Sequence, residues 1–440
     1  MFAWINSLAV VINGYLQFWF IYLQPWKGYL QSIGNWLIPD PSNWLGTNGH
    51  FPSTIELESN LSEEGGCDMK LNDFKLEVYF NKYEFSAPYL LTQSDCESMS
   101  IQELLHFEPG VEEKFLNSWL GYTEVQGNPE LRAEISKLYT NVKEDGILVH
   151  AGAQEAIFNY MNVVLNPGDH VVCQFPVYQS LYEVAPSIGC EVSTWELKQG
   201  ENGWVLDMEE LKRLIRPNTK LIAINTPNNP TGYVLSLDEM KAIVEIAREK
   251  NIHVFCDEVY KGLEYDGNRL PWFSDLYENA VSLGVMSKAY GLSGLRIGWI
   301  ATQNKEIYDK MTRFKHYTSI CSSAPSEFLT IVALRHGDKI LQRNLEIIKD
   351  NLAVADRFFQ KYDSLFTNNK PSAGPIAFHR IHIDQPTEGF CEDLIAKKGV
   401  LLLPANIYDY PASYIRMGYG RRNFPECLAK FEEYLVENFA

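Results

Sequence analysis

The 440-residue sequence predicts an α/β protein with a large domain, built on a mostly parallel sheet of the seven-stranded type covered by helices, and a smaller α+β domain. Two observations predict this fold class. Between residues 147 and 286, short apolar runs alternate with helix-like segments, which is typical of parallel strands buried on both faces. After residue 325, one long helical tract precedes short strands mixed with helices. The chain is long enough for two or three domains with a sizeable core.

Residues 1–68 stand apart from this pattern as an apolar extension and an acidic linker. Residues 1–26 carry no charged side chain, but Asn and Gln interrupt them and no Lys or Arg precedes them as in a secretory signal. A weak membrane contact, an arm packed on protein and a poorly ordered extension are three alternatives for this segment. Residues 39–66 are rich in Pro, Gly and Glu, which indicates a linker. We expect the catalytic chain to begin near Met69.

Charge and cysteine usage exclude several classes of partner. The net charge of −18 argues against nucleic acid, because binding phosphates requires concentrated Lys and Arg. The eight cysteines form no C-x-x-C pair and no nearby Cys/His cluster, which argues against a metal site and against a disulfide scaffold. Scattered reduced thiols predict a cytoplasmic location, with membrane association through residues 1–26 as the alternative.

Residues 69–120 are predicted to form an N-terminal arm and part of the small domain. Apolar positions near helical spacing run from Lys70 until Pro88 ends the pattern. A second helix is expected from Ile101, after a polar segment that contains Asp95 and Glu97. These two carboxylates either cap and solvate the helix start or face a polar or basic substrate side chain.

Residues 121–325 are predicted to form the large domain. Ligands of such sheets bind beyond the carboxyl ends of the parallel strands. Tyr178, Asn229, Asp257 and Lys288 all follow predicted strand ends, so we expect their side chains to converge at one edge. The expected strands are 147–150, 170–174, 190–195, 221–225, 253–256 and 280–286, and the expected helices are 130–139, 155–165, 208–215 and 237–250.

Residues 326–440 are predicted to contain a long connecting helix and the C-terminal small domain. The helical tract covers 326–366, and strands are expected at 377–381, 400–403 and 414–417. Arg416 lies within the last apolar run, and a buried arginine requires an anion as partner.

The segment from Val285 to Trp299 has the composition of a reactive site. Lys288 lies between small residues, and burying an ammonium group is costly unless it is paired or neutral. A lysine that forms a Schiff base with a carbonyl meets this condition. Arg296 follows among glycines as a phosphate ligand. The small-residue turn at 151–154, between a strand and a helix, is a second anion-binding signal.

Four motifs in order resemble those of one enzyme family. They are N-N-P-T-G at 228–232, D-E-V-Y at 257–260, S-K-A-Y-G-L-S-G-L-R-I-G-W at 287–299 and Y-I-R at 414–416. From about Tyr122 to the C-terminus, the chain resembles the class I/II aminotransferases, which are fold-type I enzymes dependent on pyridoxal 5'-phosphate (PLP). The resemblance covers roughly three hundred residues and leaves residues 1–68 without a counterpart.

The resemblance implies a role for each residue around the cofactor ring. Lys288 would form the internal aldimine with the cofactor aldehyde and shuttle the proton between the substrate Cα and C4′ of the cofactor. Asp257 would keep the pyridine nitrogen protonated, which makes the ring an electron sink. Tyr260 and Asn229 would hydrogen-bond the phenolic oxygen of the ring. Tyr178 would stack on its face.

The resemblance also implies how the phosphate is held. The backbone amides of Ala153 and Gln154 would bind it together with Ser287 and Arg296. Tyr122 would reach the phosphate of the neighbouring subunit's cofactor, which makes a homodimer a functional requirement.

The substrates would be small molecules, an amino acid and a 2-oxo acid, and the α-carboxylate would be bound by Arg416 with help from Asn229. Two departures from the family pattern affect ligand binding: Val285 stands where many relatives carry a phosphate-binding Ser or Thr, and residues 317–321 lack a second substrate arginine. The second departure weakens an assignment to dicarboxylic substrates.

We therefore predict an aminotransferase that transfers an α-amino group from an amino acid to a 2-oxo acid by a ping-pong mechanism. The same residues serve other reactions on this fold, so a PLP-dependent lyase, cyclase or amino-acid oxidase is the alternative. A non-enzymatic regulator is a further alternative, against which the intact Lys288, Asp257 and Arg416 argue.

Overall fold

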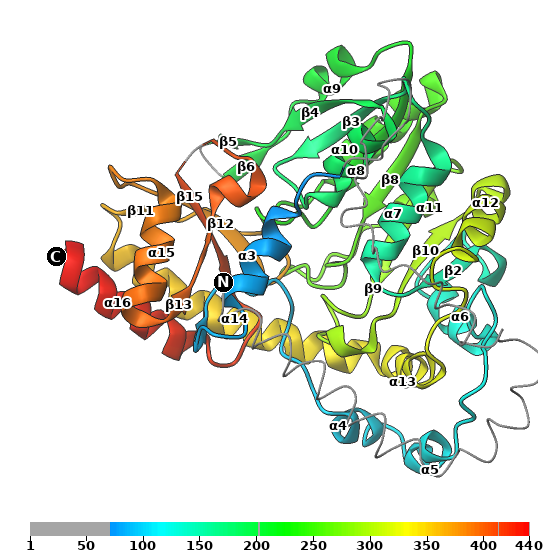
Figure 1. Ribbon diagram of the computed structural model, residues 1–440, viewed down its shortest axis with the longest axis horizontal. Coiled ribbons are helices and arrows are strands. Elements are labelled where there is room, and N and C mark those ends of the chain that lie inside the picture. Colours follow the sequence, from blue (N-terminus) through cyan, green and yellow to red (C-terminus); the bar gives the residue numbers. More distant parts are fainter. Residues whose placement is uncertain (1–70, 201–202, 412, 440) are drawn as a thin grey trace, which may run out of the picture. The chain divides into compact units, whose positions relative to one another are not determined.

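A seven-stranded sheet forms the centre of the larger part of the protein (Figure 1). The computed structural model describes residues 71–200, 203–411 and 413–439. The strand order is β2-β10-β9-β8-β7-β3-β4, and within this sheet only β10 runs antiparallel to its neighbours. The predicted mostly parallel sheet is confirmed. Its strands are β2 (Ile147–His150), β3 (His170–Phe175), β4 (Glu191–Glu196), β7 (Thr219–Asn225), β8 (His253–Asp257), β9 (Ala280–Val285) and β10 (Gly298–Thr302).

Alternate residues of the central strands enter two separate apolar cores, one on each face of the sheet. In β7, Ala223 belongs to one core and Ile222 to the other, as the two-residue period of a strand requires. Helices cover both faces, which explains why these strands are apolar throughout. The helices of this part are α6 (Pro129–Ser136), α7 (Ala153–Val164), α8 (Ser180–Ile188), α9 (Met208–Leu214), α10 (Leu237–Lys250), α11 (Phe273–Leu276) and α12 (Lys305–Lys315), with the short turns η3 (Glu144–Gly146) and η4 (Ser293–Leu295) and the hairpin β5 (Lys198–Gly200) and β6 (Gly203–Val205).

The C-terminal part is the predicted smaller α+β unit. Its four-stranded antiparallel sheet has the order β11-β12-β15-β14, and α15 and α16 pack together beside it. Long α14 runs from this sheet toward α13 (Figure 1). The elements are α13 (Ala324–Arg335), α14 (Gly337–Lys361), β11 (Phe366–Thr367), β12 (Ile376–Ile381), α15 (Thr387–Lys398), β13 (Val400–Leu401), β14 (Leu403–Pro404), η5 (Ala405–Tyr408), β15 (Tyr414–Gly418) and α16 (Phe424–Phe439).

Two predicted elements of this part differ in detail. The helical tract is interrupted at His336, whose backbone departs from helical angles and separates α13 from α14. The predicted strand at 400–403 is two short strands in different sheets, since β13 pairs with β1 and β14 with β15. The predicted boundaries between the domains at residues 69, 121 and 326 stay predictions.

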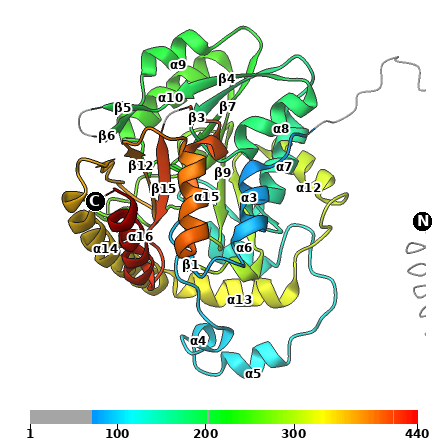
Figure 2. The same cartoon turned by 60° about the vertical axis from the view of Figure 1, so that its left-hand side comes forward.

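The described N-terminal segment crosses from the small sheet to the large one. α3 packs against η5 and is the blue helix labelled in Figure 2. Helix α4 begins with a capping box between Ser100 and Glu103, which confirms the predicted helix start. The elements are α3 (Lys75–Tyr83), β1 (Tyr89–Leu90), α4 (Ile101–Leu105) and α5 (Val111–Leu116).

The predicted apolar extension and linker, residues 1–68, lie outside the described residues. The membrane contact considered for residues 1–26 therefore stays a prediction. Among the described helices, none combines the length and the hydropathy that a membrane span requires.

Candidate active site

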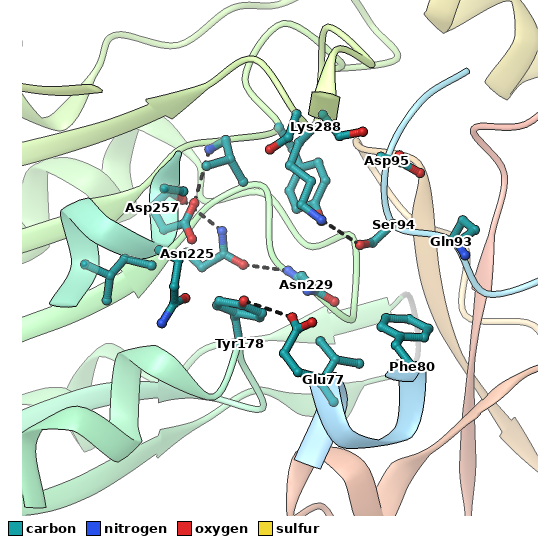
Figure 3. Close-up of a pocket in the computed structure, with 18 of the residues that line it drawn as sticks. Glu77, Phe80, Gln93, Ser94, Asp95, Tyr178, Asn225, Asn229, Asp257 and Lys288 are labelled. Atoms are coloured by element: carbon teal, nitrogen blue, oxygen red, sulfur yellow. Dashed lines mark hydrogen bonds between the residues drawn. The ribbon is translucent and has the colours of Figure 1, made fainter. Parts of the chain in front are cut away.

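A cavity of about 400 Å³ lies where the carboxyl ends of β7, β8 and β9 meet α3 and residues 92–97, a segment called the strap below (Figure 3). All predicted site residues except Tyr122 and Arg416 line it. They reach it from five separate stretches of the chain, because parallel strands bring their carboxyl ends to one edge. These residues are Ala153, Gln154, Tyr178, Asn229, Asp257, Tyr260, Ser287, Lys288 and Arg296.

Lys288 lies in the loop after β9 and points into the cavity. Its Nζ donates a hydrogen bond of 2.9 Å to Oγ of Ser94, a strap residue (Figure 3). Its main-chain oxygen accepts a hydrogen bond from the main-chain amide of Cys96. The loop that carries Lys288, called the lysine loop below, is therefore hydrogen-bonded to the strap. Burial lowers the pKa of Lys288, since desolvation disfavours the ammonium form. An amine with this environment is suited to attack a carbonyl and to move a proton.

Asp257 ends β8 at the floor of the cavity and is 4% exposed. Its Oδ1 accepts one hydrogen bond, from the Val259 amide at 3.2 Å. Burial raises the pKa of Asp257 to about 7. A buried carboxyl with so few donors is matched to a ligand that brings its own N–H, such as a protonated pyridine nitrogen.

Tyr260 and Asn229 lie beside this carboxyl. Tyr260 is 1% exposed, and its hydroxyl has no hydrogen-bond partner among the described residues. Burial raises the pKa of Tyr260, so the hydroxyl stays protonated and free to donate. Asn229 is held in place, since its main-chain amide donates to Oδ1 of Asn225 at 2.6 Å. Because Tyr260 lines the cavity, its hydroxyl is available to an oxygen of a bound ligand.

The corner formed by α7 and Arg296 is built to receive an anion. α7 begins at Ala153, and no side chain caps its first amides. A Cβ on Gly152 would lie 2.6 Å from Nη2 of Arg296, so glycine is needed for the guanidinium to approach. Ser287 and Ser293 also line this part of the cavity. With the lysine, the carboxyl and the orphaned hydroxyl, this corner fits a phosphorylated pyridine aldehyde.

Arg416 lies behind the cavity, in β15, and is fully buried. Its guanidinium donates to the main-chain oxygen of Thr92 at 2.8 Å, to Oη of Tyr408 at 2.5 Å and to Oδ1 of Asn229 at 3.2 Å. The ring of Phe80 packs over it, 5.7 Å from the guanidinium carbon. No carboxylate of the described chain forms an ion pair with it, so its charge is buried among neutral groups.

Tyr122 does not enter this cavity. It is 85% exposed, and Leu116, Trp119 and Leu120 nearby in sequence are also exposed. Its predicted contact involves a second subunit and stays a prediction.

Sequence reasoning missed the wall of the cavity formed by α3 and the strap. This wall includes Glu77, Phe80, Glu84, Gln93 and Ser94. The helical spacing predicts α3, but it does not indicate which part of the protein its face meets. The polar run at the strap was the one available signal, and the sequence left open whether it caps a helix or faces the substrate.

The geometry bears on two further expectations. Asp95 lines the cavity but pairs with Nη2 of Arg421 at 2.9 and 2.8 Å, while Glu97 does not line it. Neither is therefore a free carboxylate for a substrate. Val285 is buried in β9, away from the lining, whereas the hydroxyl-bearing Ser293 lines the cavity.

Comparison with known proteins identifies the family. The model of the family described as aminotransferase class I and II matches residues 107–424. The chain belongs to this family. It is a PLP-dependent aminotransferase of fold-type I, which confirms the fold class, enzyme class and cofactor predicted from the sequence motifs.

Individual relatives agree with this assignment. A crystal structure of a PLP-dependent aminotransferase from Streptococcus suis is 34% identical, with a TM-score of 0.79 over 84% of this chain and 98% of that one. A probable N-succinyldiaminopimelate aminotransferase of Mycobacterium tuberculosis is 32% identical over 61% of this chain and 68% of its own length. The structure of a PLP-dependent cyclase, OrfR, is 25% identical, with a TM-score of 0.77 over 84% of this chain and 98% of that one.

Proposed function

We propose that this aminotransferase moves the α-amino group of an amino acid to a 2-oxo acid in two half-reactions at the cavity around Lys288. The observation that carries the proposal is the meeting of Lys288, Asp257 and the anion-binding corner at Arg296 in one cavity. When bound, PLP supplies an aldehyde that accepts the amino group and a ring that delocalises the electron pair left at Cα.

Lys288 is the residue that moves protons. Its Nζ would take the proton from Cα of the substrate and, with PLP bound, return it on the cofactor side. The lowered pKa of Lys288 supports this role, because a neutral amine is required as base. Ser94 holds Nζ at 2.9 Å and limits the positions that the flexible side chain explores.

Other residues would hold the cofactor in a fixed orientation. Asp257 would accept a hydrogen bond from the protonated ring nitrogen, and Tyr260 and Asn229 would hydrogen-bond the ring oxygen. Tyr178 would pack on the ring face. The phosphate would be held by residues at the start of α7 and in the lysine loop, namely Ala153, Gln154, Ser287 and Arg296.

Arg416 binds the α-carboxylate of the substrate, together with Asn229. Its burial without an anion supports this role, because an unpaired buried charge gains most from a carboxylate. The Nη1 contacts with Asn229 and Tyr408 place the guanidinium next to a residue that lines the cavity. Binding then requires the carboxylate to replace neutral partners such as the Thr92 oxygen.

Single-turnover spectroscopy tests this function. Purified enzyme loaded with PLP is mixed with an amino acid and no oxo acid, and the cofactor absorbance and the oxo acid formed are followed. We expect one equivalent of oxo acid per active site, and renewed turnover when a second oxo acid is added. Steady formation of another product without an acceptor would contradict a transaminase.

A cyclase activity is the second candidate, since one of the similar solved structures is a PLP-dependent cyclase. The same residues would hold the cofactor and move the proton in that reaction. Catalytic turnover of the amino acid to a ring product, without consumption of an oxo acid, would favour this candidate.

The enzyme is proposed to act as a homodimer. A cluster of exposed apolar side chains supports this, namely Leu116, Trp119, Leu120 and Tyr122, each more than 70% exposed. We expect sedimentation equilibrium to give a dimer, and Tyr122→Ala to weaken PLP retention, because Tyr122 would reach the neighbouring phosphate. A monomer with full activity would contradict both expectations.

The proposed location is the cytoplasm. The seven cysteines of the described residues are free thiols, which fits a reducing compartment. Fractionation of cells that express the full chain tests this location against membrane association through residues 1–26.

A further inference from the structure

The acidic residues of α3 face the cavity, whereas its basic residues face away from it. Glu77 and Glu84, at the end of the helix, line the cavity together with Leu76 and Phe80. Figure 3 shows the Glu77 side chain reaching from α3 toward Tyr178. The spacing of these positions places them on one side of the helix.

The lysines of α3 are paired outside the cavity. Lys75 forms an ion pair with Asp409, and Lys82 lies 3.7 Å from Glu392. Neither lysine is a lining residue. The helix therefore presents net negative charge to the cavity.

Glu77 and Glu84 have neutral partners only. Glu77 accepts a hydrogen bond from Oη of Tyr178 at 3.4 Å, and Glu84 accepts one from Nε2 of Gln93 at 3.0 Å. Across residues 71–439, wherever the structure describes them, neither carboxylate has a Lys, Arg or His within ion-pair distance of 4.0 Å. The third acid of this wall, Asp95, is neutralised by Arg421.

The cations of the site lie elsewhere. Arg296 lies at the phosphate corner, Lys288 at the reacting centre and Arg416 behind Asn229. The buried hydroxyl of Tyr260, assigned above to the cofactor ring, has no hydrogen-bond partner among the described residues and points to ligand binding in the same cavity. An amino acid bound with its carboxylate toward Arg416 would place its side chain in the remaining space, which α3 and the strap enclose.

We propose that the amino-acid substrate carries a positive charge at the end of its side chain, an ammonium or guanidinium group, recognised by Glu77 and Glu84. This inference rests on the proposed function. Two unpaired carboxylates attract a cation and repel a side-chain carboxylate, so the same pair selects basic substrates and rejects acidic ones. Glu77 is exposed to water and Glu84 is half-buried, so solvent screening keeps the gain in binding free energy moderate.

The test compares substrates of equal shape and different charge. The rate constant of the first half-reaction, divided by the substrate concentration, is measured with the PLP-loaded enzyme. L-arginine is compared with L-citrulline, and L-lysine with L-2-aminoheptanoate, in which a methyl group replaces the ammonium group. L-glutamate is included as the acidic side chain. We expect each basic amino acid to react at least about tenfold faster than its neutral counterpart, and L-glutamate to be the slowest.

Charge-removing variants assign this preference to the two residues. Glu77→Gln and Glu84→Gln keep the shape and the hydrogen-bond acceptor, so a loss reflects the charge. We expect each to reduce the arginine-to-citrulline ratio several-fold, and the double variant to bring it close to one. The matched control is Glu245→Gln, an exposed carboxylate on α10 outside the cavity, which should leave the ratio unchanged.

The outcomes separate this inference from the proposed function. Equal rates within each pair, with transamination intact, would overturn the inference alone. An unchanged arginine-to-citrulline ratio in the double variant would also overturn it. No cofactor conversion with any amino acid, in enzyme that retains PLP, would overturn the proposed function instead. An unaltered cofactor spectrum in each variant verifies that the fold and the ring environment are intact.

Discussion

The two walls of the cavity differ in how the chain builds them. The sheet-side wall consists of residues at the ends of buried strands or in the loops just after them, among them Asn229, Asp257 and Lys288. The α3-side wall consists of α3 and the strap, which come from outside the large sheet and include Glu77 and Ser94. The first wall is placed by strand topology, whereas the second is placed by docking of a separate segment.

This difference separates chemistry from selectivity. On the sheet side, burial raises the pKa of Asp257 and lowers that of Lys288, so the groups are tuned for proton transfer. On the α3 side, Glu77 stays open to water and forms a weak contact with Tyr178. We infer that the sheet-side wall determines the reaction and the α3-side wall determines the substrate.

Replacing Lys288 by alanine should have the largest effect. Loss of the residue that moves the proton should reduce kcat by about 10⁴-fold while the fold remains. Stopped-flow measurement of the half-reaction checks this. Lys241→Ala, an exposed lysine of α10, is the control and should keep full activity. A Lys288→Ala enzyme with near-native turnover would remove the proposed mechanism.

Asp257 should make the cofactor-free protein less stable as the pH rises. Its pKa in the folded state is about 7, against 3.8 ordinarily, so the folded protein binds this proton more tightly than the unfolded chain. The resulting contribution is present below pH 4 and is lost as the pH rises to 7, by up to about 4 kcal/mol. Denaturant unfolding at several pH values checks this. The unfolding free energy of Asp257→Asn should lack the pH-dependent contribution of Asp257.

Glu327 provides the internal comparison for this experiment. Burial raises its pKa to about 7 as well, but it lies in α13 outside the cavity. Loading with PLP should abolish the pH-dependent contribution of Asp257 to the unfolding free energy, because the protonated ring nitrogen favours the carboxylate. The contribution of Glu327 should remain. If both contributions remain after loading, the pairing of Asp257 with the ring is contradicted.

Arg416→Ala should raise KM for amino acids by about 10²-fold with a smaller change in kcat, since a charge-assisted pair to the substrate carboxylate is lost. Steady-state kinetics with the amino acid and with the corresponding amine, which lacks the carboxylate, check this. The variant should discriminate less between the two. An unaltered KM would exclude Arg416 from carboxylate binding.

Ser94→Ala should have the smallest effect and tests whether the α3-side wall contributes to chemistry. Loss of one hydrogen bond to Nζ of Lys288 should reduce kcat about threefold to tenfold. Ser98→Ala, exposed and outside the cavity, is the matched control. A kcat reduced as strongly as in Lys288→Ala would mean that the strap is part of the catalytic machinery. It would contradict the inference that the sheet-side wall alone determines the reaction.

The predictability of the site follows the same division. Asp257 and Asn229 were predicted from local sequence because they lie at or just after the ends of apolar strands, whose parallel pairing brings these ends together. Glu77 was not predicted as a site residue. A helical period indicates that α3 has two faces, but it does not indicate which part of the protein each face contacts. Asp95 had the expected sign of charge, but its pairing with Arg421, 326 residues away, is invisible in the local sequence.

The sequence by itself determined the fold class through its periodicity, and the cofactor and the reactive lysine through the resemblance of four ordered motifs to one family. The tertiary structure alone decided that Arg416 is buried among neutral partners and that Ser94 holds the lysine. It also decided that Glu77 and Glu84 have no cationic partner among the described residues. Those properties depend on contacts between segments distant in sequence. Burial and charge pairing are sums over such contacts, so no local pattern encodes them.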